Sequence, residues 1–187
     1  MSGATLLAPS VEAKESAVFA IEREPQATRP RWTDANLGVQ GYCLTAEESR
    51  ALRWGLRFST ALCLALVITG LAIQSAILIL ALVPVGVVAG GTARHPFDYL
   101  WNHGLRHLSG APALPPNPTP RRHAFKLAAV WLLAVGVLFV VGEPAIAIGL
   151  GAMLVAVCGL VTTTNFCIPS TLLGLWWRRR EPEAAGA

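Results

Sequence analysis

The chain has 187 residues, of which 53% are hydrophobic and only 14% are charged, and its formal net charge is +4. An ordinary soluble domain has about 25% charged residues, so this composition excludes a typical soluble domain and indicates a protein whose helices are surrounded by lipid. The basic residues lie in the segments that flank two long apolar blocks. This placement is typical of membrane topology, and we therefore expect no nucleic-acid partner.

Residues 1–44 are predicted to form a cytoplasmic N-terminal tail. Ser10 is a candidate cap for a short amphipathic helix that ends near Arg23, and Pro25 and Pro30 interrupt any longer regular element. The tail has too little apolar surface to offset the entropy lost on ordering. We therefore expect a protein partner to order it.

Residues 45–93 are predicted to form a first helical hairpin. Thr45 and Glu48 match a capping box that begins a helix. The following 36 residues, 58–93, include no Asp, Glu, Lys or Arg and are interrupted by the polar pair Gln74-Ser75. One membrane span needs about 20 apolar residues, so this block is long enough for two. The predicted spans are residues 56–73 and 76–93.

Small residues follow a proline in the second of these spans. Pro84 lies near its middle, and glycines stand at positions 86, 90 and 91. A proline removes a backbone donor, and glycines allow two helix backbones to approach closely. We expect a kink here and close packing against the other helix of the hairpin, and the functional alternative is a lined cavity or a site for a partner helix.

Residues 94–124 are predicted to form a cytoplasmic loop made of two parts. The first is an interfacial helix that begins at Pro96 and has aromatic residues suited to the depth of lipid headgroups. His103 and His107 share a face of this helix, but the sequence offers no third metal ligand near them. The second part, residues 111–120, is rich in proline and should be extended.

Residues 125–164 are predicted to form a second helical hairpin, with spans at 125–141 and 145–162 joined by a turn at 142–144. Neither predicted turn contains Lys or Arg, whereas all three flanking segments do. The positive-inside rule then places both termini and the central loop in the cytoplasm. The fold class expected is an all-α membrane protein of four spans, in the inner membrane of a bacterium.

Residues 165–187 are predicted to form an interfacial C-terminal segment with a basic tail. Its apolar part is too short to span a bilayer, so tryptophan and arginine side chains should anchor it at the surface. Together with aromatic and histidine residues upstream, these anchors are the candidates for contact with partners or lipid: Trp54, Pro96, Phe97, Tyr99, Trp101, His103, His107, Trp176, Trp177 and Arg178.

The chain's four cysteines are dispersed and form no Cys-x-x-Cys pair. Cytoplasmic thiols are kept reduced, so Cys63 and Cys158 are interpreted first as small apolar residues in helix contacts. The spans contain no carboxylate for a proton relay, and no nucleophilic triad or phosphate loop is present. The sequence thus contains no positive indication of enzymatic activity, of a catalytic residue or of a metal site.

The segment Phe166-Cys167-Ile168-Pro169-Ser170 follows the fourth predicted span. With this ending, residues 45–179 resemble an uncharacterised bacterial family of four-helix membrane domains that has Phe-Cys-x-x-Cys at this point. Members of that family often occur beside thioredoxin-like or rhodanese-like proteins, so the resemblance implies a connection with thiols or sulfur. Here Ser170 replaces the second cysteine, and only Cys167 corresponds to the family pattern.

Two functions therefore stand as expectations, with a third kept open. The first is a non-catalytic accessory subunit that stabilises a larger membrane complex of photosynthetic or respiratory electron transport, in contact with other membrane subunits. The second is a membrane protein that handles thiols or sulfur through Cys167. A small-molecule channel in a homo-oligomer is the third. No cofactor can be named from the sequence, and lipid or pigment contacts at the helix surface stay open.

Overall fold

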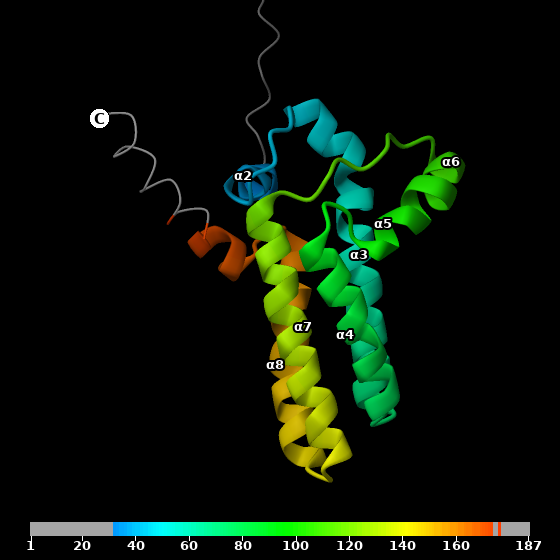
Figure 1. Ribbon diagram of the computed structural model, residues 1–187. Helices are drawn as coiled ribbons and strands as arrows, with labels where there is room; N and C mark the ends of the chain where they lie inside the picture. Colours follow the sequence, from blue (N-terminus) through cyan, green and yellow to red (C-terminus); the bar gives the residue numbers. More distant parts are fainter. Residues whose placement is uncertain (1–31, 174–175, 177–187) are drawn as a thin grey trace, which may run out of the picture. The chain divides into compact units, whose positions relative to one another are not determined.

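The computed structural model describes residues 32–173 and residue 176, and the statements that follow concern those residues. Within them every regular element is helical, which confirms the expected all-α class. Residues 168–173 also form a helical segment. The elements are α2 (Trp32–Val39), α3 (Ala46–Ala72), α4 (Ala76–Gly91), α5 (Pro96–Leu100), the π-helical η1 (Trp101–Leu105), α6 (Arg106–Ser109), α7 (Thr119–Val140) and α8 (Pro144–Thr164) (Figure 1).

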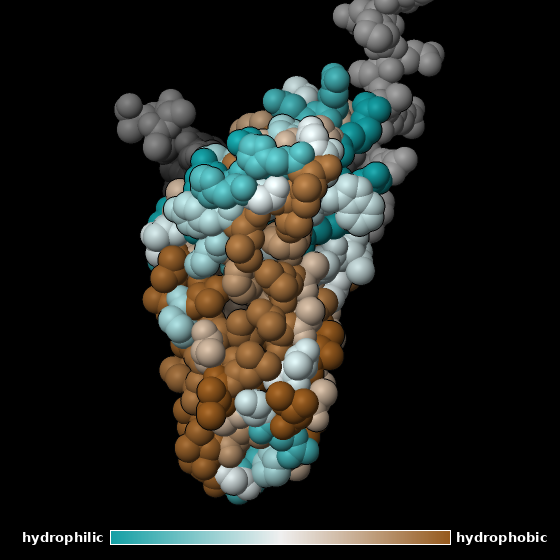
Figure 2. All heavy atoms as spheres, turned by 90° about the vertical axis from the view of Figure 1, so that its right-hand side faces the viewer, coloured by the Kyte–Doolittle hydropathy of each residue, from teal (hydrophilic) through white to brown (hydrophobic). Residues whose placement is uncertain are grey.

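Three of the described helices, α3, α7 and α8, are each long and apolar enough to cross a membrane. Helix α4 has 16 residues and meets the same criterion only together with the segment at 96–109, from which it is bent by 83°. Figure 2 shows apolar side chains covering much of the helical body on one face, with hydrophilic residues gathered toward one end. The sequence and the fold therefore agree on a protein suited to several membrane crossings.

The helix ends lie where local sequence signals predict them. Thr45 accepts a hydrogen bond from the Glu48 amide at 3.2 Å, and the Glu48 carboxylate accepts one from the Thr45 amide at 2.8 Å, which completes the capping box. Gln74 takes a left-handed conformation (φ 51°) in the turn before α4, where Ser75 caps the new helix. Gly142 does the same (φ 84°) before α8, which begins at Pro144.

Helix α4 packs closely against α7 through small residues. A Cβ atom added at Gly86 would lie 2.9 Å from Ala129 Cβ, and one added at Gly90 would lie 3.1 Å from the Arg122 carbonyl oxygen. Such distances are shorter than van der Waals contact, so only glycine permits this approach. Gly86 and Gly90, which follow Pro84, thus contact α7 and not the hairpin mate α3, which corrects the expectation, and α4 continues as one helix through this proline.

The helices are arranged so that each long helix contacts two others. Helix α3 packs against α4 and α8, and α7 packs against α4 and α8, as the ribbon view shows (Figure 1). The Trp131 indole N–H donates to the Leu150 carbonyl at 3.0 Å and ties α7 to α8. Buried apolar side chains from all four helices form the core between them: Val67, Ile79, Leu82, Leu132, Val135, Ala147 and Leu154.

Residues 32–44 differ from their expected role as part of a tail. Helix α2 and the residues after it fold against the main helices, and Leu37 and Tyr42 are buried in a second apolar cluster. Gln40 is also buried and donates to the Asn165 carbonyl, while Asn36 donates to the Thr164 carbonyl at 3.0 Å. The sequence did not reveal this docking because both partners lie more than 120 residues away. The helix expected at 10–23 lies outside the described residues.

The loop between the hairpins has the expected division into two parts. A helix begins at Pro96 and continues as α5, η1 and α6 up to Ser109, and residues 111–118 are non-helical. Trp101, a candidate for contact with lipid or a partner, is instead buried in the second cluster with 7% exposure. Its ring lies 5.5 Å from that of Phe58 and fills the space beside Gly55.

Candidate functional site

A cavity of about 140 Å³ lies between the four long helices. Its walls are mainly apolar and include Val67, Leu82, Trp131 and Leu154. Three thiols and one imidazole also line it: Cys63 from α3, Cys158 from α8, Cys167 from the segment after α8, and His95 from the residue before α5. The chain therefore brings together three of its four cysteines from distant positions.

His95 faces Cys63 across a contact of 3.7 Å between Nε2 and Sγ. The Nδ1 atom of the same ring accepts a hydrogen bond from the Phe97 amide at 3.1 Å. A neutral imidazole has one N–H, so the proton must reside on Nε2, which then acts as a donor toward the Cys63 sulfur. The ring is held further by Phe125, whose centroid is 5.0 Å away at an edge-on angle.

His95 is uncharged at neutral pH. It is 2% exposed, and this burial lowers the pKa of its imidazole to about 4. The nearby Asp98 carboxylate acts in the opposite direction and raises the pKa of His95, and the Arg121 guanidinium lowers it again. Loss of solvation outweighs the attraction to Asp98, and the cavity is therefore bordered by a neutral hydrogen-bond donor.

Cys167 reaches the cavity because the chain turns sharply after α8. Asn165 takes a left-handed conformation (φ 55°) and ends the helix, and Cys167 follows with its side chain buried. Ser170, which is completely buried, places its Oγ 3.2 Å from the Cys167 sulfur and 3.3 Å from the Pro120 carbonyl oxygen. A hydroxyl group has one proton, so Ser170 can donate to only one of these two acceptors at a time.

A buried carboxylate stands behind His95. Asp98 is 6% exposed and accepts three hydrogen bonds, from the Ser59 hydroxyl, from the His95 amide at 2.8 Å and from the Asn117 side-chain amide at 3.0 Å. Three donors satisfy a carboxylate that would otherwise be costly to bury. Asp98 thereby joins α3, the start of α5 and the extended loop, and it fixes the backbone of His95.

A buried arginine links the same region to α2 and α3. Arg121 donates to the Tyr42 hydroxyl at 3.0 Å and to the Leu56 carbonyl at 2.9 Å, and its guanidinium lies 5.7 Å from the Phe125 ring. Burial raises the pKa of Tyr42, so its hydroxyl stays protonated and donates to Asn117 at 2.8 Å. The residues Tyr42, Ser59, Asp98, Asn117 and Arg121 are called the polar network below.

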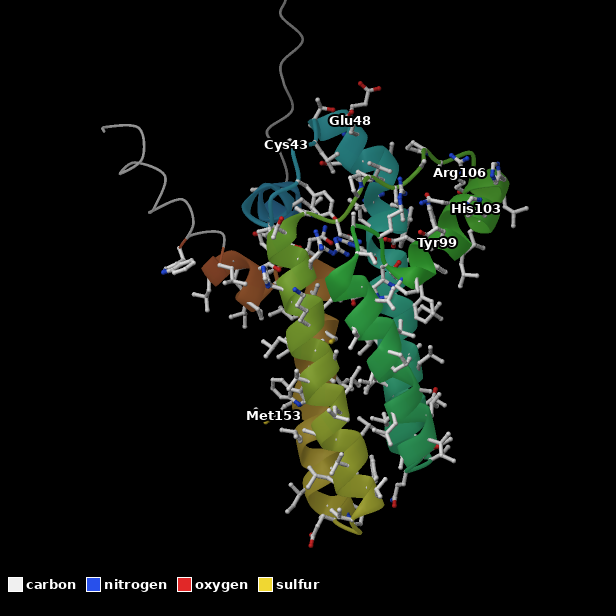
Figure 3. The ribbon with its side chains drawn as sticks, viewed as in Figure 1. Cys43, Glu48, Tyr99, His103, Arg106 and Met153 are labelled. Atoms are coloured by element: carbon white, nitrogen blue, oxygen red, sulfur yellow. The ribbon has the colours of Figure 1, made fainter. Side chains whose placement is uncertain are left out.

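The sequence candidates for contact with partners or lipid lie apart from the cavity, except near His95. Pro96 and Phe97 form the first turn of α5 beside that histidine. Tyr99 stacks on His103 at 6.1 Å, and these side chains and Arg106 lie on the arm formed by α5, η1 and α6 (Figure 3). His107 on this arm is exposed, as are Trp54 and Trp176. Trp177 and Arg178 lie outside the described residues.

Sequence reasoning found Cys167 but missed His95 and the polar network. His95 has one local signal. It precedes Pro96 at the start of a helix, and Asp98 lies three positions after it, which is the spacing of a capping box. No local signal marks Tyr42, Asn117 or Arg121, since each is buried by partners far away in the chain.

The cavity residues do not form a metal site. In the part of the chain that the structure describes, no three His, Cys, Asp or Glu side chains are grouped closely enough to hold a metal ion. The four cysteines all lie in this part, and none of them is in a disulfide. The available chemistry is therefore that of thiols beside a neutral imidazole in a largely apolar space.

The fold and the site define an all-helical protein of the membrane type with a thiol-lined cavity among its long helices. Within this class, the chain belongs to the family described as a domain of unknown function, DUF4395, which it matches over residues 53–178. This confirms the resemblance to an uncharacterised domain family. The match begins after α2 and includes every residue that lines the cavity. No curated protein and no solved structure matches the chain.

Proposed function

We propose that this protein takes up small sulfur compounds in the cavity of a four-span membrane domain, with Cys167 as the receiving thiol. The observation that supports this proposal is the meeting of Cys63, Cys158 and Cys167 with His95 around one cavity. Cysteine thiolates are the side chains that attack sulfur in sulfur-transfer reactions. A cysteine that only fills space would be expected in a closely packed core and not at the wall of a cavity. The second cysteine of the family pattern is absent, but two other thiols border the same cavity.

The proposed topology counts α4 as the fourth span. Its 16 residues extend about 24 Å along the helix, somewhat less than the roughly 30 Å apolar thickness of a bilayer, and local thinning accommodates such a difference. Both chain ends and the loop at 94–124 would lie on the cytoplasmic side of a bacterial inner membrane, because the basic residues cluster there. The polar network then faces the cytoplasm, and the cavity lies just beneath it.

The character of the cavity wall limits the substrate class. A cavity of about 150 Å³ with apolar walls can hold a molecule the size of benzene, and the cavity observed here is of similar size, about 140 Å³. Arg121, the nearest buried cation described above, is engaged by Tyr42 and the Leu56 carbonyl. An anion would lose its hydration without an available counter-charge. The substrate class we propose is therefore an uncharged sulfane-sulfur donor, such as a small alkyl hydropersulfide.

The proposed step is transfer of a sulfane sulfur from a hydropersulfide, RS–SH, to Cys167. The Cys167 sulfur attacks the terminal sulfur, a new S–S bond forms, and the S–S bond of the donor breaks. The thiol proton of Cys167 passes to the leaving sulfur, so the products are a Cys167 persulfide and RSH. As negative charge develops on Cys167, the Ser170 hydroxyl can turn from the Pro120 carbonyl and donate to the sulfur.

The test uses the full-length protein in lipid vesicles, treated with methyl hydropersulfide, a small donor without a charged amino or carboxyl group, and analysed by alkylation and peptide mass spectrometry. We expect a persulfide on Cys167 in the wild type and in Cys43→Ser, and no such product in Cys167→Ser. Cys43 is the matched control because it is an exposed thiol outside the cavity. A persulfide on Cys43 with none on Cys167 would contradict the proposal.

A second candidate function, the accessory subunit of a photosynthetic or respiratory complex, is supported by the outer face of α8. Its small residues Ala145, Gly149, Ala152 and Ala156 are all exposed, and nothing lies within 4 Å of a Cβ placed at Gly149. Small residues in this spacing allow a partner helix to pack closely in a membrane.

The accessory role is tested by mild-detergent purification from the native membrane, with mass spectrometry and an absorption spectrum of the product. Stoichiometric recovery with a larger pigment- or haem-bearing complex is the expected outcome for this role, and recovery alone would contradict it. A truncation that removes residues 1–31 should weaken such assembly if the tail contacts the partner. Removal of residues 1–42 would be a poor test, because Leu37, Gln40 and Tyr42 are buried in the fold.

A further inference from the structure

We infer that Cys63 and His95 form a second sulfur site in the cavity, which accepts the sulfur first taken up by Cys167. The inference rests on the proposed function and adds the acceptor that it requires. Position 170, where the family pattern has its second cysteine, is occupied by Ser170. A hydroxyl group cannot accept sulfane sulfur from a persulfide on Cys167. The other thiols that line the cavity, Cys63 and Cys158, are the acceptors that this chain offers.

Cys63 has the contacts that an acceptor thiol needs. Its sulfur lies 3.7 Å from His95 Nε2, the ring nitrogen that bears the proton. A donor directed at the sulfur stabilises the thiolate form of Cys63, which is the form that attacks an S–S bond. Cys63 and His95 line the same cavity as Cys167, so the cavity connects the two proposed sites.

The position of His95 is determined by groups that do not themselves face the sulfur. The Phe97 amide holds Nδ1, and the Asp98 carboxylate holds the His95 backbone amide at 2.8 Å. The Phe125 ring packs edge-on against the imidazole. These contacts fix the tautomer and aim the Nε2 proton at Cys63, which is the kind of preorganisation that a reacting group requires.

The transfer step conserves atoms and charge. The Cys63 sulfur attacks the outer sulfur of the Cys167 persulfide, the S–S bond at Cys167 breaks, and a new S–S bond forms at Cys63. The thiol proton of Cys63 moves to the Cys167 sulfur. The products are a Cys63 persulfide and a free Cys167 thiol, and no oxidant or reductant is consumed.

The experiment measures the persulfide at each cysteine over time after a limiting dose of methyl hydropersulfide, with the full-length protein in vesicles. In the wild type we expect sulfur on Cys167 first and on Cys63 later. In Cys63→Ser the sulfur should accumulate on Cys167, and in Cys167→Ser neither site should load. A Cys63 persulfide in Cys167→Ser would overturn the proposed order of transfer.

His95→Asn tests the role of the imidazole. An asparagine oxygen can still accept from the Phe97 amide and cap α5, but the side chain is too short to reach the Cys63 sulfur. We expect transfer from Cys167 to Cys63 to slow by about tenfold or more, since the hydrogen bond that stabilises the Cys63 thiolate is lost. Transfer at the wild-type rate in a folded His95→Asn protein would overturn this role.

The failures of the two proposals are distinguishable. If Cys167 loads and Cys63 stays unmodified in the wild type, the inference of a second site fails and the proposed function stands. If Cys167 never loads, the proposed function itself fails. Because Cys63→Ser changes one atom, it provides a decisive variant even where His95→Asn does not fold.

Discussion

Replacement of Asp98 tests how much the polar network stabilises the fold. Asp98→Ala leaves three buried donors without an acceptor: the Ser59 hydroxyl, the His95 amide and the Asn117 side-chain amide. Each unsatisfied buried group costs about 1–3 kcal/mol, and partial relaxation brings the expected loss in unfolding free energy to about 3–5 kcal/mol. The change should be among the most damaging single substitutions outside the apolar core.

Asp98→Asn should be much milder. The asparagine oxygen can replace Oδ2 and accept from His95 and Asn117, while its amide group donates to Ser59, whose hydroxyl is able to reverse its role. Only the charge assistance of these hydrogen bonds is lost, so we expect a loss of about 1–2 kcal/mol.

The measurement is unfolding of the purified protein in mixed detergent micelles, followed by tryptophan fluorescence and extrapolated to zero denaturant. Glu47→Ala is the control, because Glu47 is an exposed carboxylate in the first turn of α3 and should contribute less than about 1 kcal/mol. An Asp98→Ala protein as stable as this control would refute the argument. Equal losses in Asp98→Asn and Asp98→Ala would refute the proposed reversal at Ser59.

Four further predictions concern single positions. The pKa of His95 is about 4 in the fold, against an ordinary 6.5, so the folded state binds fewer protons than the unfolded state between these pH values. The unfolding free energy should therefore fall by about 3 kcal/mol on acidification from pH 6.5 to pH 4. His95→Asn should remove this part of a measured profile of stability against pH. Gly86→Ala should lower the thermal midpoint, at a cost of about 1–3 kcal/mol, because its Cβ would lie 2.9 Å from Ala129 Cβ. Gly149→Ala places a Cβ in open space, so it should leave the unfolding free energy unchanged or raise it by up to about 1 kcal/mol. A larger loss of stability in Gly149→Ala than in Gly86→Ala would contradict the packing at these two positions. Thr45→Ala should cost about 1 kcal/mol in the same assay through loss of the capping box, and an unchanged midpoint would contradict that role.

The polar network and the cavity are parts of one arrangement. Asp98 holds the backbone at His95, and Arg121 contacts the Phe125 ring that packs against the same imidazole. Substitutions in the network should therefore alter Cys63 reactivity as well as stability.

The sequence by itself determined the features that depend on local physics. A run of 36 residues without charge, a polar turn at Gln74-Ser75 and the capping box at Thr45 are readable because hydrophobic length, turn chemistry and helix capping act between near neighbours. The same reasoning placed the helix at Pro96 and the extended proline-rich segment, and it marked Cys167 through the family pattern.

Tertiary structure alone decided which residues meet. The sequence predicts a tail at residues 32–44 because Asn36 and Gln40 find their hydrogen-bond partners only at the end of α8 in the folded protein. It predicts a membrane anchor at Trp101 because the space that this ring fills beside Gly55 is formed only by helix packing. Cys63, Cys158 and Cys167 are separated by up to 104 positions, and no spacing rule connects them. They converge because α3 packs against α8 and because Asn165 turns the chain back toward the core, contacts that depend on the packing of whole helices and not on any local pattern.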